Sequence, residues 1–494
     1  MKSIIIVGGG SAGWITANLL NAKLNKNAGA PVTITVIESP DIPTIGVGEA
    51  TIPSIRRTLQ TIGVDERVFM RATDATFKNL IRFDGWSKDG TYDHPFDRRT
   101  RPDTDASIGA WLAENPQNTN QNEFAQIYSL LTHISNAGRG PKAPTWPTYQ
   151  SPFPYAYHLD AIKLARFLAE HGRKHGIKHH LANVTSVEVD ERGHISKIDT
   201  DAVGAHKADL YVDCTGFRAV LSKQNLNIKS KNFSQYLLCD SAVTMRVPYE
   251  IYRPPTLKPY TAATAMKAGW RWDIGLRNRR GLGYVYASAY ENQDGAERTL
   301  RAQEGHHADG LSTQHIKFKT LQSETPWSGN CVAIGLSAGF LEPLESSGIY
   351  LIEFAAEMLA KLLPYAGDIL RPLAMSFNQQ MDLIFTEILE YLNLHYCLSN
   401  RDDSTFWREV QKPEHVLPSL QEKLELWKIK PPSDTDFPYP LRLFSLQSYE
   451  YLLFGMGYKP KSLPLRGGTI PGFAEAIEKS LQKLPYHENL LAQY

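Results

Sequence analysis

The stretch "SIIIVGGGSAGWITANLL", residues 3–20, decides how the chain begins to fold. A short run of β-branched residues at 3–7 ends at consecutive glycines, and an Ala/Leu-rich stretch with the pattern of a helix follows over roughly residues 12–25. The next apolar run, "VTITVIE", ends at Glu38. This order predicts a strand, a tight turn, a helix and a second strand, which is how a parallel α/β sheet starts.

Gly8, Gly10 and Gly13 spell GxGxxG between the first strand and the helix. Glycines permit the tight turn and let backbone N–H groups approach a pyrophosphate at the helix N-terminus, where the helix dipole favours negative charge. Glu38 stands where an acidic side chain binds ribose hydroxyls. We therefore predict a dinucleotide site. The alternative is a glycine-rich turn that is needed only for close packing of the helix on the strand.

The composition excludes several classes of protein. A 494-residue chain with 42% hydrophobic and 21% charged residues is typical of a folded protein with more than one packed region. Its 53 basic and 52 acidic side chains argue against a nucleic-acid partner or an anionic membrane surface. Glycines interrupt the first apolar run, so it indicates a core strand rather than a signal peptide or a membrane span. We predict a cytoplasmic protein.

The four cysteines lie far apart, without a CxxC pair or the spacing of metal ligands. Such residues are typical of buried thiols in a reducing compartment. We therefore predict no metal site.

Later stretches continue the nucleotide-binding pattern. The strands "ADLYVDCTGF" and "GNCVAIG" and the helix "GIYLIEFAAEMLAKLL" are interpreted as further pieces of one domain that insertions interrupt, a layout that favours FAD over NAD. The predicted fold class is α/β, with a Rossmann-type, flavoprotein monooxygenase-like FAD-binding domain, a mixed sheet and helical substrate region, and a helical C-terminal part. The predicted regions are an FAD-binding domain (1–96, 150–235 and 325–365), a surface insertion or lid (97–149), a substrate-side sheet (236–324) and a helical region (366–494).

One lysine raises a separate question. In "ATFKNLIRF", residues 75–83, Lys78 stands among apolar side chains. Burial lowers the pKa of a lysine, and a nearby carboxylate favours its charged form. Taken alone, such a lysine is more often part of a structural ion pair, or reaches the surface with its ammonium group. The local sequence leaves both interpretations open.

Three further stretches identify a family. They are "GVGEATIP" (46–53), "GWRWDIGL" (269–276) and "FLEPLESSGIY" (340–350). Together with the glycine motif and "TFKNLIRF", they resemble the flavin-dependent halogenases of the tryptophan-halogenase type, in the same order along the chain. The resemblance implies reduced FAD, a chloride or bromide ion and O2 as reactants, a separate NADH-dependent flavin reductase, a small aromatic substrate and a homodimer.

The resemblance also implies roles for individual residues. Lys78 holds hypohalous acid beside the aromatic substrate, and Glu345 lies close to it and assists halogenation. Ser347 and Gly348 line the halide site. The remaining implied contacts are with FAD and come from Ser11, Ala12, Ala50, Gly335, Gly348 and Ile349.

Trp270 and Trp272 match the family's tryptophans that wall off the flavin, so that it does not act as an ordinary monooxygenase. The family pattern is W-x-W-x-I-P, and this chain departs from it because Gly275 replaces the proline. The alternative for both tryptophans is core packing, since residues two apart on a strand point to one face.

The substrate residues are predicted from two stretches. His94 and Phe96, in "HPF", resemble the histidine and phenylalanine that flank the substrate ring. Tyr449 and Glu450, in "FSLQSYEYLLFGMGY" (444–458), correspond to the part of the family that closes over the substrate, although a core helix is the alternative there. We expect tryptophan or a simpler indole as the substrate.

The implied reaction is electrophilic halogenation. Hypohalous acid, made from halide and O2 with reduced FAD, reaches Lys78, and Glu345 stabilises the cationic ring or accepts its proton. Two alternatives remain: an FAD-dependent aromatic hydroxylase that binds NAD(P)H itself, and a non-catalytic flavin-binding protein. Neither requires this lysine, glutamate and pair of tryptophans together.

Overall fold

The structure is a computed structural model of the 494-residue chain. It describes residues 1–26, 31–42, 46, 48–88, 90–97, 123–366, 370–440, 442–458 and 472–494. The chain divides into two compact units, each made of three separate stretches. The first unit consists of Met1–Ala75, Leu159–Phe233 and Lys319–Phe385, and the second of Thr76–His158, Ser234–Phe318 and Thr386–Tyr494.

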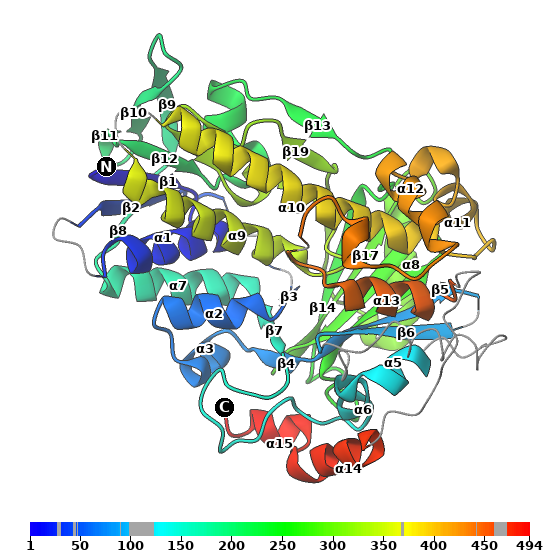
Figure 1. Cartoon of the computed structure of the whole chain (residues 1–494). Helices are drawn as coiled ribbons and strands as arrows, with labels where there is room; N and C mark the ends of the chain where they lie inside the picture. Colours follow the sequence, from blue (N-terminus) through cyan, green and yellow to red (C-terminus); the bar gives the residue numbers. More distant parts are fainter. Residues whose placement is uncertain are drawn as a thin grey trace. The chain divides into compact units, whose positions relative to one another are not determined.

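A six-stranded sheet in the order β20-β21-β12-β1-β2-β8 forms the centre of the first unit (Figure 1). Neighbouring strands run parallel except at β20, which is antiparallel to β21. Both predicted later strands join this sheet, β12 beside β1 and β21 beside β12, so the predicted strand–helix–strand start and its continuation are confirmed. The strands are β1 (Ser3–Val7), β2 (Thr33–Glu38), β8 (Lys178–Leu181), β12 (Leu210–Asp213), β20 (Trp327–Ser328) and β21 (Cys331–Ala333).

Helix α1 (Ser11–Leu24) contacts α7 (Ala161–Lys174), α9 (Ser347–Leu362) and α2 (Ser54–Thr61) (Figure 1). Its apolar side chains are buried on several sides, as expected for a helix enclosed by others. The carboxylate of Asp160 caps α7 by accepting the backbone N–H groups of the second and third helical residues. In contrast, α1 begins at a residue without a capping side chain.

Short elements complete the first unit. The alternating sequence at 183–200 forms a hairpin, in which β9 and β10 pair antiparallel and β11 extends them. A further sheet has the order β13-β19-β22. These elements are α3 (Glu66–Ala72), β3 (Gly48–Ala50), β9 (Val184–Val189), β10 (Ile195–Thr200), β11 (Gly204–His206), η1 (Gly216–Arg218), η2 (Val220–Asn225), β13 (Ser230–Asn232), β19 (Leu321–Ser323), η4 (Gly335–Ser337), β22 (Gly339–Phe340) and η5 (Leu363–Tyr365).

A seven-stranded sheet in the order β18-β14-β17-β16-β15-β5-β6 forms the centre of the second unit. The alternating sequence at 236–290 predicts its middle strands correctly. Residues 76–96, expected in the FAD-binding domain, lie in the second unit, because β5 pairs with β15. The strands are β5 (Leu80–Ser87), β6 (Gly90–Pro95), β14 (Ser241–Pro248), β15 (Tyr260–Met266), β16 (Gly269–Gly275), β17 (Arg279–Tyr286) and β18 (Thr313–Lys317).

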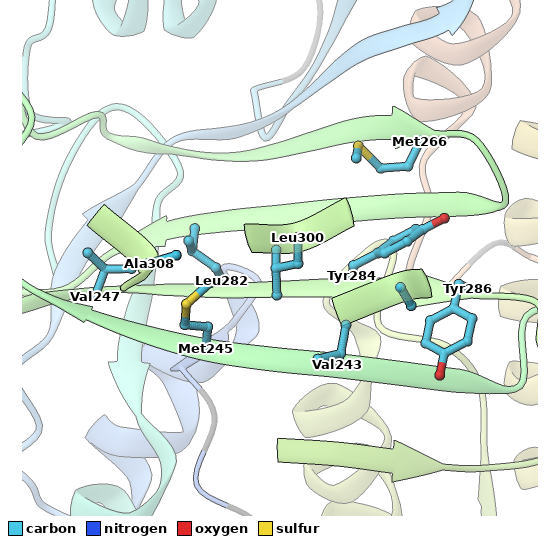
Figure 2. Close-up of a cluster of buried hydrophobic side chains, with 10 residues drawn as sticks. Val243, Met245, Val247, Met266, Leu282, Tyr284, Tyr286, Leu300 and Ala308 are labelled. Atoms are coloured by element: carbon cyan, nitrogen blue, oxygen red, sulfur yellow. The ribbon is translucent and has the colours of Figure 1, made fainter. Parts of the chain in front are cut away.

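An apolar cluster packs between this sheet and helix α8 (Gln293–Glu304), as Figure 2 shows. Val243, Met245 and Val247 alternate along β14 and therefore point to one face. Leu300 of α8 packs against them and is fully buried. Complete burial of such a side chain stabilises a fold by roughly 1.5–3 kcal/mol.

The described part of the predicted surface insertion carries core side chains. Helix α5 (Glu123–Tyr128) buries Phe124, and α6 (Leu130–Asn136) buries Leu131 and Ile134. The segment is polar on average, but these apolar residues recur at helical spacing and form one buried side. Residues 98–122 lie outside the described residues.

The region after residue 366 is mostly helical, as predicted. None of the helices in the described ranges is both long and apolar enough to cross a membrane. The helices are α10 (Arg371–Cys397), α11 (Thr405–Glu409), η6 (Pro413–His415), α12 (Pro418–Trp427), η7 (Asp434–Asp436), α13 (Leu446–Gly455), α14 (Phe473–Lys483) and α15 (His487–Leu491), and η3 (Gly305–Ala308) follows α8.

Candidate active site

The glycine motif forms a turn that tolerates no side chain at two positions. Gly8 has a φ of +114°, and a Cβ atom there would lie 2.2 Å from the carbonyl oxygen of Cys214. A Cβ atom on Gly13 would lie 1.9 Å from the carbonyl oxygen of Gly8. Gly10 precedes α1 with open space around it and no capping side chain. The start of α1 therefore offers backbone N–H groups and the positive end of its dipole to an anion.

Glu38 lies directly against this turn. A Cβ atom on Gly9 would fall 2.1 Å from the carboxyl carbon of Glu38, so the carboxylate covers the backbone of the loop. Nε2 of His179, on β8, lies 2.9 Å from Oε2 of Glu38. The sequence predicted the position of Glu38, whereas its histidine partner comes from another strand and was not foreseen.

The other predicted FAD contacts of the first unit differ in their surroundings. Gly335 has a φ of +74°, and a Cβ atom there would lie 2.8 Å from Cβ of Ala12, so this glycine permits close packing on α1. Ser11 is the first residue of α1, and Ala50 ends β3. Ile349 is buried in the first turn of α9.

The start of α9 has the features of an anion site. Ser346 precedes the helix with a φ of +59°, a conformation that is strained for a residue with a side chain, and it caps α9 without its hydroxyl group. Ser347 is the first helical residue, and Gly348 has open space where a side chain would be. Glu345 is buried and stands before the helix rather than in its first turn.

Two further carboxyl groups of the first unit were not singled out from the sequence. Desolvation raises the pKa of Glu49, in β3, to about 7. Burial likewise raises the pKa of Glu353, on α9, to about 7, although Ser54 donates a hydrogen bond to it at 2.6 Å. An acid inside the apolar stretch "GIYLIEFAAEMLAKLL" is the signal that would have identified Glu353.

In the second unit, Lys78 is fully buried, so its ammonium group does not reach the surface. It ends β4 (Thr76–Lys78), where it pairs with Ala156 of β7 (Ala156–Asp160). Its Nζ atom lies 5.2 Å from the centre of the Phe96 ring, a cation–π distance. Burial, followed by the charge of Lys78, holds the pKa of His158 well below its usual value.

The two predicted ring-flanking residues have different neighbours. Phe96 lies beside Lys78, whereas the His94 ring lies 5.7 Å from that of Tyr391 and 6.3 Å from that of Phe444. Tyr391 and Phe444 stack on each other, with ring centres 3.7 Å apart. The structure therefore brings Phe96 to the lysine and places His94 at an aromatic cluster.

Trp270 and Trp272 lie side by side on β16, with ring centres 6.1 Å apart. Trp270 is buried, and Trp272 lies across Gly283, where a Cβ atom would be 2.0 Å from the indole ring. Gly275 departs from the family's proline for a visible reason. A Cβ atom there, which proline would add, would lie 2.3 Å from Leu257. The carbonyl oxygen of Gly275 accepts a 2.6 Å hydrogen bond from the Thr76 hydroxyl of β4, a bond that proline would also permit.

Tyr449 and Glu450 are buried within α13, as the core-helix alternative predicts. The Tyr449 ring contacts those of Tyr391, Phe437 and Trp427. Burial raises the pKa of Tyr449, as do the nearby carboxylates of Glu387 and Glu390. Within the described ranges, its hydroxyl oxygen has no hydrogen-bond partner. A buried hydroxyl group of this kind suits a polar group of a ligand.

The sequence spacing predicted no metal site, but Glu409, Glu414 and His415 place potential ligand atoms within 4.8 Å of one another. Lys412 lies 2.8 Å from Glu409, and both ring nitrogens of His415 have partners, in Gln235 and Glu409. These interactions account for the group as a surface ion-pair cluster.

Lys78 belongs to the second unit and Glu345 to the first. The structure thus assembles each half of the predicted site separately: the glycine turn, Glu38 and the α9 start in one unit, and Lys78, Phe96 and the two tryptophans in the other. All four cysteines are free thiols; Cys214, Cys239 and Cys331 are buried as predicted, whereas Cys397 is partly exposed.

Comparisons with known proteins agree on one family. Residues 3–468 match the family described as tryptophan halogenase. The chain is 38% identical over 477 residues to tryptophan 6-halogenase SttH of Streptomyces toxytricini, covering 92% of this chain and 88% of that protein. The crystal structure of a tryptophan halogenase from Shewanella frigidimarina has a TM-score of 0.91 and 35% identity, covering 100% of this chain and 97% of that one. Tar14, a tryptophan C-6 flavin-dependent halogenase from taromycin biosynthesis, has a TM-score of 0.90 and 35% identity, covering 100% and 99% of the two chains.

Proposed function

Because the chain belongs to the tryptophan halogenase family, whose members are flavin-dependent enzymes, we propose that it halogenates tryptophan or a simpler indole with a halide ion, O2 and reduced FAD. The observation that carries the proposal is the fully buried Lys78, whose ammonium group faces the Phe96 ring. Burying an ammonium group costs free energy, and the position of Lys78 beside an aromatic ring, within a stretch that matches the family, is what favours a role in the chemistry.

The first unit fits a flavin dinucleotide. The turn of Gly8, Gly10 and Gly13 leaves the backbone open at the α1 N-terminus, and Glu38 lies where the ribose hydroxyls would bind. When bound, reduced FAD supplies with O2 the oxidising equivalents that convert halide to hypohalous acid. Further contacts are assigned to Ser11, Ala12, Ala50, Gly335, Gly348 and Ile349.

The halide is assigned to the start of α9. The backbone N–H groups of Ser347 and Gly348 stand at the positive end of a 16-residue helix that has no capping side chain. Gly348 leaves room for an ion because, apart from its chain neighbours and the backbone of its own helix, no atom lies within 4 Å of where its Cβ would be.

Lys78 acts as a cation in this proposal. Its ammonium group donates a hydrogen bond to the oxygen of hypohalous acid and makes the halogen more electrophilic. The neighbouring Phe96 ring favours the charged form through its negative face. The aromatic carbon then bonds to the halogen, the halogen–oxygen bond breaks, and the oxygen takes a proton from the Lys78 ammonium and leaves as water; the proton that the ring loses balances this one. Glu345 accepts the proton that the ring carbon loses.

The remaining residues orient the substrate and protect the chemistry. We assign Phe96 and His94 to the flanks of the indole ring, and the buried hydroxyl of Tyr449, with Glu450, to its polar end. Trp270 and Trp272 separate the cofactor from the substrate, so that the oxidant is delivered as hypohalous acid. Exclusion of water preserves this oxidant.

The test is a mass-spectrometric assay with FAD, NADH, an unrelated flavin reductase, chloride or bromide, and tryptophan and indole offered together. We expect a product with a two-isotope halogen pattern. Lys78→Met is expected to lower its yield by about 100- to 1,000-fold, because one preorganised donor is lost. Lys142→Met is the matched control, since Lys142 is equally buried but its ammonium donates to the carbonyl oxygen of Pro147 at 2.9 Å.

Glu345→Gln completes the test, with an expected loss of about 100-fold for a missing general base. If both residues act in one step, the double variant is no slower than Lys78→Met alone. A product heavier by one oxygen, formed with NADH and no reductase, would instead establish the hydroxylase. FAD binding without any turnover of aromatic compounds would establish the non-catalytic alternative.

A further inference from the structure

We propose that His487, the first residue of α15, is a positioning residue that holds strand β4 and thereby fixes the Lys78 ammonium. The inference rests on the catalytic role of Lys78 proposed above. It concerns a residue 410 positions from the strand it contacts, with no recognisable motif around it.

Both ring nitrogens of His487 make hydrogen bonds in the second unit. The backbone N–H of Phe77, the residue before Lys78, donates to Nε2 at 3.2 Å. Nδ1 lies 3.0 Å from the carbonyl oxygen of Leu257. Since Nε2 accepts a hydrogen bond, Nδ1 must carry the ring hydrogen and donate a hydrogen bond to the carbonyl oxygen of Leu257. The ring therefore bridges β4 and the segment before β15 in one defined tautomer.

This bridge requires a neutral ring, because a protonated imidazole has no lone pair to accept the Phe77 N–H. His487 is 1% exposed, and burial lowers its pKa to about 4. The C=O of Leu257 raises this pKa and Arg277 lowers it further, while His158 on β7 is the other titratable ring coupled to His487. The bridge is thus intact at neutral pH.

The backbone of His487 is itself held by hydrogen bonds, which fix the position from which the ring extends. Its N–H donates to the carbonyl oxygen of Gly138 at 2.9 Å, and Gly140 donates to Pro485 at 3.0 Å. Beside it, the Arg139 guanidinium lies 3.9 Å from the centre of the Tyr486 ring. Glu488 accepts the backbone N–H of Leu257 at 3.0 Å.

Strand β4 depends on such contacts because it is only three residues long and pairs along one edge with β7. The Phe77 ring is enclosed by the rings of Tyr155, Tyr157, His487 and Tyr494. On the other side of Lys78, the N–H of Asn79 donates to Pro259 at 2.8 Å. The backbone is therefore hydrogen-bonded on both sides of Lys78. The Phe77 N–H bonds to the side chain of His487, and the Asn79 N–H bonds to the backbone carbonyl oxygen of Pro259.

The experiment compares His487→Gln, His487→Asn and His487→Phe in the full chain at neutral pH. A glutamine oxygen can replace Nε2 as the acceptor for Phe77, whereas asparagine can replace only Nδ1 and phenylalanine neither. Leu490→Ala is the control, because it removes a fully buried side chain from the same helix without a bond to β4.

Two readouts are independent of turnover: hydrogen exchange of the Phe77 amide, and the rate at which an amine-acylating reagent modifies Lys78. We expect both to rise about tenfold or more in the Asn and Phe variants, because the buried N–H loses its partner. The Gln variant and Leu490→Ala should stay within about twofold of wild type. Halogenated product per reduced flavin should fall about tenfold in the same two variants, since a small misplacement of a catalytic group is costly.

The inference is overturned if the three His487 variants change both readouts equally, or no more than Leu490→Ala does. If exchange and acylation rise only in the Asn and Phe variants but the wild type makes no halogenated product, the proposed function fails. The inference that His487 positions Lys78 then stands. If the wild type halogenates and this difference among the variants is missing, the function stands and the inference fails.

Discussion

The glycine turn of the first unit and strand β4 of the second position their functional groups by opposite means. In the turn, side chains are absent at Gly8 and Gly13 because backbone atoms occupy their places. In β4, the backbone of Phe77 is held by a side chain, His487, from a distant part of the sequence. The first arrangement follows from local backbone geometry, and the second depends on long-range packing. Substitutions should therefore damage the two regions in different ways.

The largest effect is expected from Gly13→Ala, which tests the turn. The new methyl group would meet the Gly8 carbonyl oxygen at 1.9 Å, so the turn must open. We expect the free energy of unfolding to fall by roughly 1–3 kcal/mol and FAD affinity to fall about 100-fold. FAD titration by fluorescence and urea unfolding measure the two quantities, while Lys78 acylation should not change.

Gly10→Ala sharpens this test, because open space surrounds that position. Stability should be retained while FAD affinity falls, since the added methyl group obstructs the approach of the pyrophosphate. Unchanged FAD affinity would mean that the turn serves only the packing of α1 on β1.

The next effect concerns Glu353, a buried carboxyl group of the first unit whose pKa is raised from 4.5 to about 7, mainly by burial. The folded state keeps the proton to higher pH than the unfolded state does. The part of the free energy of unfolding that depends on the protonation of Glu353 is therefore fully present below about pH 4.5 and is lost as the pH rises to about 7. The loss is about 3 kcal/mol at 1.36 kcal/mol for each pKa unit.

Glu353→Gln should remove this pH dependence and make the apo protein more stable than wild type at pH 8, as measured by urea unfolding at pH 5 and pH 8. Glu357→Gln serves as the control on the same helix. The charge of Glu357 contributes only the smallest part of the raised pKa of Glu353, and Glu357 also lies 3.6 Å from Lys23, so Glu357→Gln should retain most of the pH dependence. Equal pH profiles for wild type and Glu353→Gln would contradict the assignment.

The smallest effect is expected at Glu387. This residue binds the segment that carries Phe444, which belongs with His94 and Tyr391 to the aromatic cluster of the second unit. Its carboxylate accepts the backbone N–H groups of Arg442, Leu443 and Phe444 at 3.0, 2.9 and 2.9 Å. Phe444 stacks on Tyr391. Glu387→Ala should release this segment and raise KM for the indole substrate about tenfold, which corresponds to about 1.4 kcal/mol.

FAD affinity should be unchanged in Glu387→Ala, which distinguishes it from the glycine variants. Glu387→Gln keeps one acceptor oxygen, so its KM should lie between those of wild type and the alanine variant. A change in FAD affinity of similar size would show that the two regions do not act separately.

Much of the fold was predictable from residue type. The glycine spacing, the β-branched run before it and Glu38 predict β1, α1 and β2, because those residues meet strict backbone and packing requirements within a short segment. The strands β12 and β21 were also predictable, since they read as short apolar runs beside turns. The motifs around Lys78, Trp270 and Glu345 indicated the family but not the surroundings of each side chain.

Other features depend on contacts between distant segments. Residues 76–96 join the second unit because β5 pairs with β15, and pairing across almost 180 residues leaves no local pattern. Gly275 in place of proline is explained by the close approach of Leu257, which no motif around it indicates.

The glycine turn could be predicted from the sequence alone, because the ability to adopt a positive φ and the absence of a Cβ atom are properties of a single residue type. The burial of Lys78, its ring neighbour Phe96 and the bond from Phe77 to His487 are properties of packing. A long cationic side chain can be exposed or buried with the same local sequence, and the free energy of either state depends on which groups the rest of the chain brings to it.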